Sequence, residues 1–347
     1  MKYQNLKCLA VLNCTLLIFC QFSSAQMVDL QVNDTEKKVD VKIDGKLFTA
    51  YIYPDNVKKP ILWPIISQAG NMLTRSYPMI NKEGDRTDHP HHVGVWLNYG
   101  DVNGLDFWNN SEAISPEKRD QYGSIYHRSI EKVESGKGNA TLITTADWKS
   151  PDNTIMLEEQ TSFNFIVQEN VRIIDRITTL KTGIYEVKFT DNKEGMFAIR
   201  VARELELPSE SPTELMDARG NVTRVEKMDN QFVKGNYRSA DGVEGKEVWG
   251  TRSRWMKLSS EIKGETVALI IIDHPSNVGY PTYWHARDYG LFAANTLGQS
   301  IFSDGKNVLN FSMKKGESVT FKYRLVVAAE NLTDDQINKL AGDYAKK

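Results

Sequence analysis

Three of the six histidines in this sequence lie within four positions. The segment 88–96, DHPHHVGVW, places His89, His91 and His92 directly after Asp88. Imidazole is the usual acid/base group near neutral pH, and a neighbouring carboxylate can fix which ring nitrogen carries the proton. In an extended chain His89 and His91 share one face and His92 faces the other side. The segment therefore predicts proton transfer by His91 or His92.

A second cluster of chemically capable residues lies near the C-terminus. Trp284, His285, Arg287 and Asp288 fall within five positions of the segment 277–300. His285 is predicted to be the second acid/base group, and Arg287 could bind a carboxylate or sulfate through two parallel hydrogen bonds. The alternative is an ion pair made by Arg287 or Asp288 beside a packed tryptophan.

Aromatic and polar residues elsewhere predict sugar recognition. Ring faces pack on the C–H surface of a sugar, and polar side chains bond to its hydroxyls. Arg200 stands between two alanines on one face of its strand and has room to reach a ligand. The alternatives are a solvated edge charge for Arg200 and an ordinary Asp/Asn/Gly turn for the segment 97–110. The predicted substrate-binding residues are Trp96, Asp101, Asn103, Arg200, Trp284 and Arg287.

A metal site is the alternative to acid/base chemistry. A protein site for zinc needs about three convergent nitrogen or oxygen donors. The ligands would be His89, His91, His274 and His285. Their spacing matches no zinc signature, so we favour no cofactor and keep a divalent metal as the alternative. His274 follows an apolar strand and precedes Pro275, which favours a strand-end role. Glu194, in DNKEG, is predicted to be a turn residue.

The N-terminus has the pattern of a secretory signal peptide. Lys2 and Lys7 precede an apolar run, and small residues end at Ala25, which predicts a leader over residues 1–25. All three cysteines lie in it, so the mature chain, residues 26–347, would have no disulfide or cysteine nucleophile. We expect a periplasmic or secreted protein. Lipid attachment at Cys20 is the less favoured alternative, because Phe19 is a poor residue before a lipid-bearing cysteine.

The charge balance favours neither nucleic acid nor an anionic membrane as a partner. The chain has 43 basic and 45 acidic residues, and loss of Lys2 and Lys7 with the leader would lower the net charge from −2 to −4. After the leader, no apolar run approaches the length of a membrane span.

Short strands dominate the rest of the sequence. Segments such as 139–148, 158–167 and 195–207 show period two or β-branched enrichment between turn residues. One helix is predicted after Thr333, where Gln336 completes a capping box. We therefore predict one all-β domain over residues 26–347. It would be a large two-sheet antiparallel sandwich with a short C-terminal helix.

Several motifs together resemble a known family. The segments PILWPIISQAGNMLTRSYP, DHPHHVGVWLNYGDVNGLDFW, KEGMFAIRVA, VWGTRSRW and DHPSNVGYPTYWHARDYGLFAANTLG are similar to the secreted bacterial domain family of unknown function labelled "methane oxygenase PmoA". The resemblance spans about residues 45–330. This chain has Val93 and Tyr99 where many members carry an arginine and a histidine. The matching positions are His89, His91, His92, Trp96, Asp101, Asn103, Arg200, His274, Trp284, His285 and Arg287.

The resemblance implies a mutarotase-like sandwich in a glycan-utilisation setting. With no membrane span after the leader, we expect no methane monooxygenase activity. We expect a carbohydrate or oligosaccharide ligand and acid/base chemistry of an epimerase, lyase or hydrolase. Two alternatives stay open: a non-catalytic glycan-binding protein, which would not need the histidines, and a histidine-ligated metalloprotein.

Overall fold

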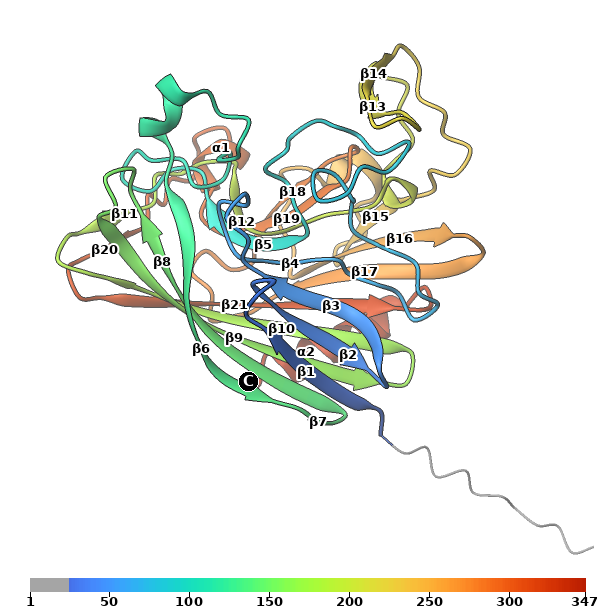
Figure 1. Ribbon diagram of the computed structural model, residues 1–347, viewed down its shortest axis with the longest axis horizontal. Helices are drawn as coiled ribbons and strands as arrows, with labels where there is room; N and C mark the ends of the chain where they lie inside the picture. The colour runs from blue at the N-terminus through green and yellow to red at the C-terminus, as the bar shows by residue number, and fades with distance from the viewer. Residues whose placement is uncertain (1–24) are drawn as a thin grey trace, which may run out of the picture.

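The computed structural model describes residues 25–347, which form two large antiparallel sheets (Figure 1). The predicted leader, residues 1–25, lies outside the described residues except for Ala25. The two sheets and a short C-terminal helix confirm the predicted all-β class and the two-sheet antiparallel sandwich.

The larger sheet has nine strands. From edge to edge the order is β18 (Tyr283–Ala286), β19 (Leu291–Asn295), β12 (Gly195–Arg200), β5 (Val95–Tyr99), β4 (Ile61–Leu62), β3 (Lys46–Ile52), β2 (Lys38–Ile43), β1 (Met27–Asn33) and β7 (Gly136–Lys137). Asp44 and Gly45 join β2 to β3 with positive φ angles of 48° and 78°, as the primed hairpin turns require. Strands that are far apart in sequence, such as β5, β12 and β18, thereby come to one end of this sheet.

The smaller of the two large sheets has eight strands. Their order is β15 (Asn236–Ser239), β16 (Trp255–Ile262), β17 (Glu265–Asp273), β21 (Ser318–Ala328), β10 (Val171–Thr182), β9 (Ile155–Gln168), β8 (Asn139–Lys149) and β6 (Ser124–Glu134). Long neighbouring strands such as β9 and β10 pair over twelve positions. This sheet supplies the rigid base on which the other one packs.

Short elements complete the described chain. Two small sheets pair β11 (Val187–Lys188) with β20 (Ser312–Met313) and β13 (Thr213–Met216) with β14 (Val222–Val225). Four helical turns lie in the connections: η1 (Pro116–Gln121), η2 (Arg203–Leu205), η3 (Gly245–Val248) and α1 (Gln299–Phe302).

The main hydrophobic core lies between the two large sheets. Phe197 of β12 stacks on Tyr323 of β21 with ring centroids 5.1 Å apart, and Tyr51 of β3 meets Phe163 of β9 at 5.7 Å. Each pair joins the two sheets. Phe197 and Ile199 both face this core, while Ala198 between them faces the opposite side of the sheet, as period two requires.

The C-terminal helix covers the outer face of the eight-stranded sheet. Helix α2 (Asp334–Tyr344) begins at the predicted capping box, where Thr333 Oγ1 accepts from the backbone N–H of Gln336 at 3.3 Å. Ile337 of this helix packs with Ile270 of β17 and Val326 of β21. The central strands are therefore buried on both faces, which explains the unbroken apolar run VALIIID in β17.

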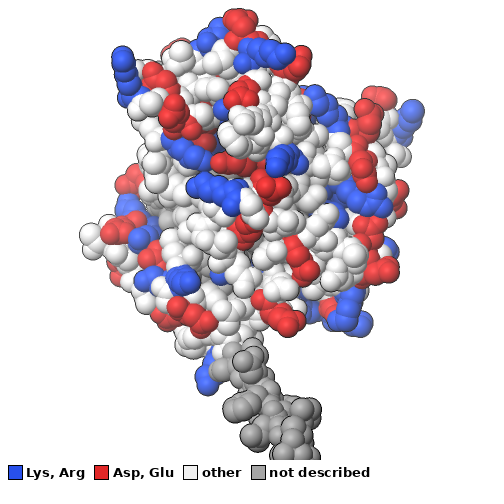
Figure 2. All heavy atoms as spheres, turned by 90° about the vertical axis from the view of Figure 1, so that its right-hand side faces the viewer, with Lys and Arg blue, Asp and Glu red and all other residues white. Residues whose placement is uncertain are grey.

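The outer face of the nine-stranded sheet is also covered, by loops. Trp96, Ala198 and Ala293 point to this side and pack with Trp108 from the loop after β5. On the face of the molecule in Figure 2, acidic and basic side chains are interspersed. The loop before β5 carries His89, His91 and His92, and that side of the molecule is the candidate site.

Candidate functional site

A row of four residues crosses the nine-stranded sheet and forms the floor of the site. Trp96 pairs with Ala198, Ala198 with Ala293, and Ala293 with His285. Residues opposite one another in neighbouring strands point to the same side. Because the two alanine side chains are short, the floor has a depression between the indole of Trp96 and the imidazole of His285.

His92 lies over this floor as a fixed, neutral ring. It stacks on Trp96 at 5.4 Å, and Trp108 Nε1 donates to its Nε2 at 3.1 Å. An indole can only donate, so Nε2 is the acceptor and the single ring proton lies on Nδ1. That nitrogen lies 3.3 Å from Nη1 of Arg200, another donor, so this contact is not a hydrogen bond. Burial, together with nearby positive groups, holds the pKa of His92 well below its usual value. His92 has no free nitrogen for proton transfer.

His89 has the geometry that His92 lacks. Its Nδ1 lies 3.1 Å from Oδ2 of Asp88, which fixes the proton on Nδ1 and leaves the Nε2 lone pair free. The ring stacks between His92 at 4.9 Å and Tyr289 at 5.1 Å, and its side chain is 41% exposed. His89 is thus an oriented imidazole that a ligand can reach.

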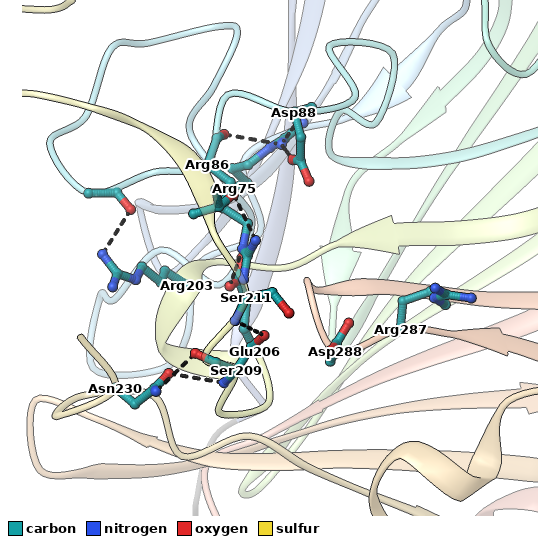
Figure 3. Close-up of polar contacts among 12 residues, drawn as sticks. Arg75, Arg86, Asp88, Arg203, Glu206, Ser209, Ser211, Asn230, Arg287 and Asp288 are labelled. Carbon is teal, nitrogen blue, oxygen red and sulfur yellow. Dashed lines mark hydrogen bonds and ion pairs between the residues drawn. The ribbon is translucent and has the colours of Figure 1, made fainter. Parts of the chain in front are cut away.

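Asp88 is held in turn by two buried arginines. Its Oδ1 accepts from Arg75 at 2.9 Å and from Arg200 at 2.6 Å, and Arg75 also donates to backbone carbonyls of the same loop (Figure 3). Burial alone would raise the pKa of Asp88, but the hydrogen bond from His89 and the two guanidinium groups hold it below its usual value. The carboxylate is therefore ionised while it orients His89.

The arginines belong to a larger buried charge cluster. Arg86 Nε donates to Glu206 at 2.7 Å, as Figure 3 shows beside Arg75 and Asp88. Burial raises the pKa of Glu206 to about 7, against the opposing effect of Arg86. Arg200 is fully buried, with its guanidinium 4.9 Å from the ring centre of Tyr289. This position excludes the solvated edge charge, and it commits Arg200 to Asp88 and not to a ligand.

His285 is a second oriented imidazole, at the far end of the floor. Its Nδ1 donates to the backbone carbonyl of Lys193 at 2.9 Å, so its Nε2 carries a lone pair. Burial, with a contribution from Arg287, lowers the pKa of His285 to about 3. The ring is therefore neutral at physiological pH, and a proton that it accepts is readily released again.

Glu194 lies beside His285 and was not expected at the site. Its Oε2 is 3.8 Å from Nδ1 of His285, and burial raises its pKa. The sequence placed Glu194 in a turn. The structure shows why it is positioned: its carbonyl accepts from Gly100 N at 2.7 Å, which ties it to the end of β5. A carboxyl group with a raised pKa beside a neutral imidazole is a suitable acid/base pair.

Trp284 lies in the core and not at the site. It points between the sheets, is fully buried and donates from Nε1 to Ser253 Oγ at 2.9 Å. Adjacent residues of a strand face opposite sides, so Trp284 and His285 cannot both reach one ligand. In this position Trp284 is not exposed on the outer side of the sheet, where His285 lies.

Asp101 and Asn103 shape a turn away from the floor. Asp101 Oδ1 accepts from Gly104 N at 2.9 Å, and Asn103, with φ of 52°, donates to the carbonyl of Glu186 at 3.0 Å. Asn103 Oδ1 also accepts from the backbone of Lys188 in β11. Both side chains are used in hydrogen bonds that fix the turn. Asp101 and Asn103 therefore fit the alternative role of turn residues better than the predicted role of sugar-binding residues.

His91 is not part of the row of residues that forms the floor. It lines a cavity of about 180 Å³ together with Tyr77 and Asn110, and its Nε2 has no hydrogen-bond partner among residues 25–347. Its carbonyl accepts from the buried Lys59 at 2.7 Å, and burial lowers the pKa of that amine to about 7. His91 is adjacent to His92 but does not join it on the floor.

The four histidines of the metal alternative do not form one cluster, although the rings of His89 and His91 lie 5.6 Å apart. His274 ends β17 in the other sheet, where Nδ1 lies 2.7 Å from Ser276 Oγ and the ring packs on Tyr344 of α2. His89 and His91 lie in the loop before β5, and His285 lies in β18. Within the described part of the chain, no group of three His, Cys, Asp or Glu side chains is placed to hold a metal ion. We therefore derive no step through a metal.

Arg287 is exposed beside the floor. Its guanidinium lies 5.7 Å from the ring centre of Tyr289 and 6.0 Å from that of Trp249.

Among the helices of residues 25–347, none is long and apolar enough to cross a membrane.

Fold and site together define a two-sheet β-sandwich with oriented imidazoles and a carboxyl group on the outer side of one sheet. The chain belongs to a family of unknown function, DUF6807, whose model matches residues 38–342. A search of curated protein sequences found no match.

Several solved structures share a distant likeness. The galactosidase domain of the α-galactosidase–sucrose kinase AgaSK is 9% identical, with a TM-score of 0.42, over 88% of this chain and 42% of the other. The α-galactosidase AgaB of Geobacillus stearothermophilus is 13% identical, with a TM-score of 0.41, over 86% and 40%. A putative aldose 1-epimerase of Escherichia coli K12 is 12% identical, with a TM-score of 0.30, over 87% and 99%. This chain thus spans about two fifths of the galactosidases, and at these scores no function is carried over.

Proposed function

We propose that this chain is a secreted or periplasmic carbohydrate-active protein that performs acid/base chemistry on a sugar or oligosaccharide. One observation carries the proposal. His89 and His285 each have Nδ1 tied to an acceptor and Nε2 without a partner among the described residues, and the carboxyl group of Glu194 lies 3.8 Å from Nδ1 of His285. Proton transfer at a sugar carbon or glycosidic oxygen needs such groups within hydrogen-bond reach.

The three groups have different roles in this proposal. His285 is neutral and accepts a proton at Nε2, while the carboxyl group of Glu194, whose pKa burial raises, lies beside its Nδ1 and is the second acid/base group. His89 acts from the opposite side of the floor, with Asp88 orienting its ring. His89 and Glu194 thus replace His91 and His92, which were predicted from sequence.

The surrounding aromatic rings support a sugar as the ligand. Tyr289 is partly exposed beside His89, and Trp249 is exposed beyond it. Such faces pack on the C–H surface of a pyranose. The "methane oxygenase" label of the family that the motifs resemble adds nothing to this site, and oxidation of methane is not part of the proposal.

The test is turnover on a panel of oligosaccharides that includes uronates and 3-keto sugars, followed by chromatography and NMR. His285→Asn and His89→Asn keep an N–H near the Nδ1 position and remove Nε2, and Glu194→Gln removes the acid. We expect each to lower turnover by about a hundredfold or more, with binding retained. Glu134→Gln, on exposed β6, is the matched control. Unchanged turnover in all three site variants would overturn the acid/base roles. Binding without turnover in the wild type would favour the non-catalytic glycan-binding alternative.

A further inference from the structure

Arg287 is a cation without a counter-charge next to the proposed acid/base groups. It follows β18 directly, two residues after His285, and its side chain is exposed. No carboxylate of residues 25–347 lies within 4.0 Å of its guanidinium, whereas the buried arginines of the site, Arg75, Arg86 and Arg200, each have one. The charge of Arg287 is therefore available to a ligand.

The nearest acid in the sequence is already paired. Asp288 Oδ2 lies 3.1 Å from Nζ of Lys246, in the η3 turn. In Figure 3 no dashed line joins Asp288 to Arg287, and their side chains extend in different directions. The ion pair predicted as an alternative for this segment exists, but Asp288 makes it with Lys246 and leaves Arg287 free.

Two aromatic rings set the position of the free guanidinium. Tyr289 and Trp249 lie 5.7 and 6.0 Å from it, within the range of cation–π attraction. Trp249 is itself 39% exposed and is backed by Phe302 at 5.6 Å. An exposed indole that packs on a neighbouring aromatic ring offers a flat surface for a sugar ring.

This cation lies within reach of the same ligand as the floor. The guanidinium of Arg287 lies 5.7 Å from the ring centre of Tyr289, and His89 stacks on the same ring with centroids 5.1 Å apart, so both groups contact one aromatic ring. Arg200, the other arginine expected to bind an anion, is fully buried on Asp88. Among the arginines of the site, Arg287 alone is placed to recognise charge on a ligand.

We propose that the ligand is a sugar with a negatively charged substituent, a carboxylate or a sulfate ester, which Arg287 binds while Trp249 packs on a sugar ring. This inference rests on the proposed function and narrows its substrate class. A guanidinium binds either anion through two parallel N–H donors, which an amide cannot replace.

The test is calorimetric titration of the full chain with three matched sets of oligosaccharides: uronates, their methyl esters and sulfated neutral sugars. The ester removes the charge and keeps the sugar. We expect the acids to bind roughly tenfold or more tightly than their esters. Arg287→Gln should abolish this preference, and Trp249→Leu should weaken acid and ester alike. Arg224→Gln, on exposed β14, removes the same charge elsewhere and should change neither.

The outcomes separate the two proposals. Equal affinity for acids and esters with no tighter binding of sulfated sugars, or a preference that survives Arg287→Gln, would overturn the anionic class and leave acid/base chemistry on a neutral sugar in place. Tight binding of sulfated sugars but not uronates would support the charged class and assign the sulfate ester as its source. Failure of every sugar, charged or neutral, to bind would overturn the proposed function and this inference together.

Discussion

Asp88 Oδ1 lies 2.6 Å from Nη2 of Arg200, although the two residues are 112 positions apart in the sequence. Arg200 ends β12 in the sheet, and Asp88 lies in the loop above it. Since Arg200 is fully buried, the carboxylate is what neutralises it. The same carboxylate orients His89, so one ion pair connects the stability of the loop to the geometry of the site.

Asp88→Asn should therefore destabilise the fold as well as reduce activity. It leaves the guanidinium groups of Arg75 and Arg200 with an amide, and loss of one partner of a buried pair costs about 3 kcal/mol. Denaturant unfolding measures this change. Asp343→Asn breaks an exposed pair with Lys339 and should leave the free energy of unfolding almost unchanged. Similar losses in the two variants would contradict the importance of the buried pair.

Acidification should destabilise the wild type more than the variant His285→Asn. The unfolded chain protonates His285 near pH 6.5, but the folded chain does so only at about pH 3, so its contribution to stability is lost as the pH falls between these values. The groups around the ring are Lys193, Glu194, Arg287 and His89, and they are the same in both proteins. Thermal unfolding from pH 7 to 4.5 measures the difference.

Other buried groups act in the opposite direction. Burial raises the pKa of Glu206 and of Asp273 to about 7, so their contribution is lost as the pH rises through 7. The informative quantity is therefore the difference between the two proteins at each pH. Parallel melting curves across the whole range would show that His285 titrates normally in the folded chain.

The capping box of α2 gives a separate prediction about stability. Thr333 accepts from Gln336 N, and Gln336 Oε1 accepts from Thr333 N at 2.8 Å. Thr333→Ala removes the hydroxyl that accepts from Gln336 N and should lower the free energy of unfolding by about 1 kcal/mol. Thr333→Ser keeps the hydroxyl and should retain most of the stability. An Ala variant as stable as wild type would show that α2 is held by packing alone.

Chelator treatment should leave the melting temperature and the turnover unchanged. His274 lies in the opposite sheet from His285, and both nitrogens of His92 face donors, so among the described residues no three histidines are placed to hold one ion. Elemental analysis of the mature protein, with His91→Ala and His285→Ala in parallel, is the direct measurement. A stoichiometric metal that both variants lose would return the metalloprotein alternative to first place.

The sequence determined the fold class and much of its local structure. Period-two patterns marked the strands, Asp44-Gly45 marked a hairpin, and Thr333 with Gln336 marked the start of α2. These signals are local, because they depend on backbone geometry over a few residues. The sequence also placed His89, His92, His285 and Arg287 in the two segments that meet at the site.

Which side chains meet at the site depends on the tertiary structure. In YWHA, alternation alone shows that Trp284 and His285 face opposite sides, but both faces of this sheet are buried, so the pattern does not say which one faces the ligand. The local sequence around Glu194 is that of a turn. The arrangement of strands β5, β12 and β18 places Glu194 beside His285 in the structure. Asp88, Arg75 and Arg200 come together through pairing between distant strands. Such contacts depend on strand order, which no short stretch of sequence encodes.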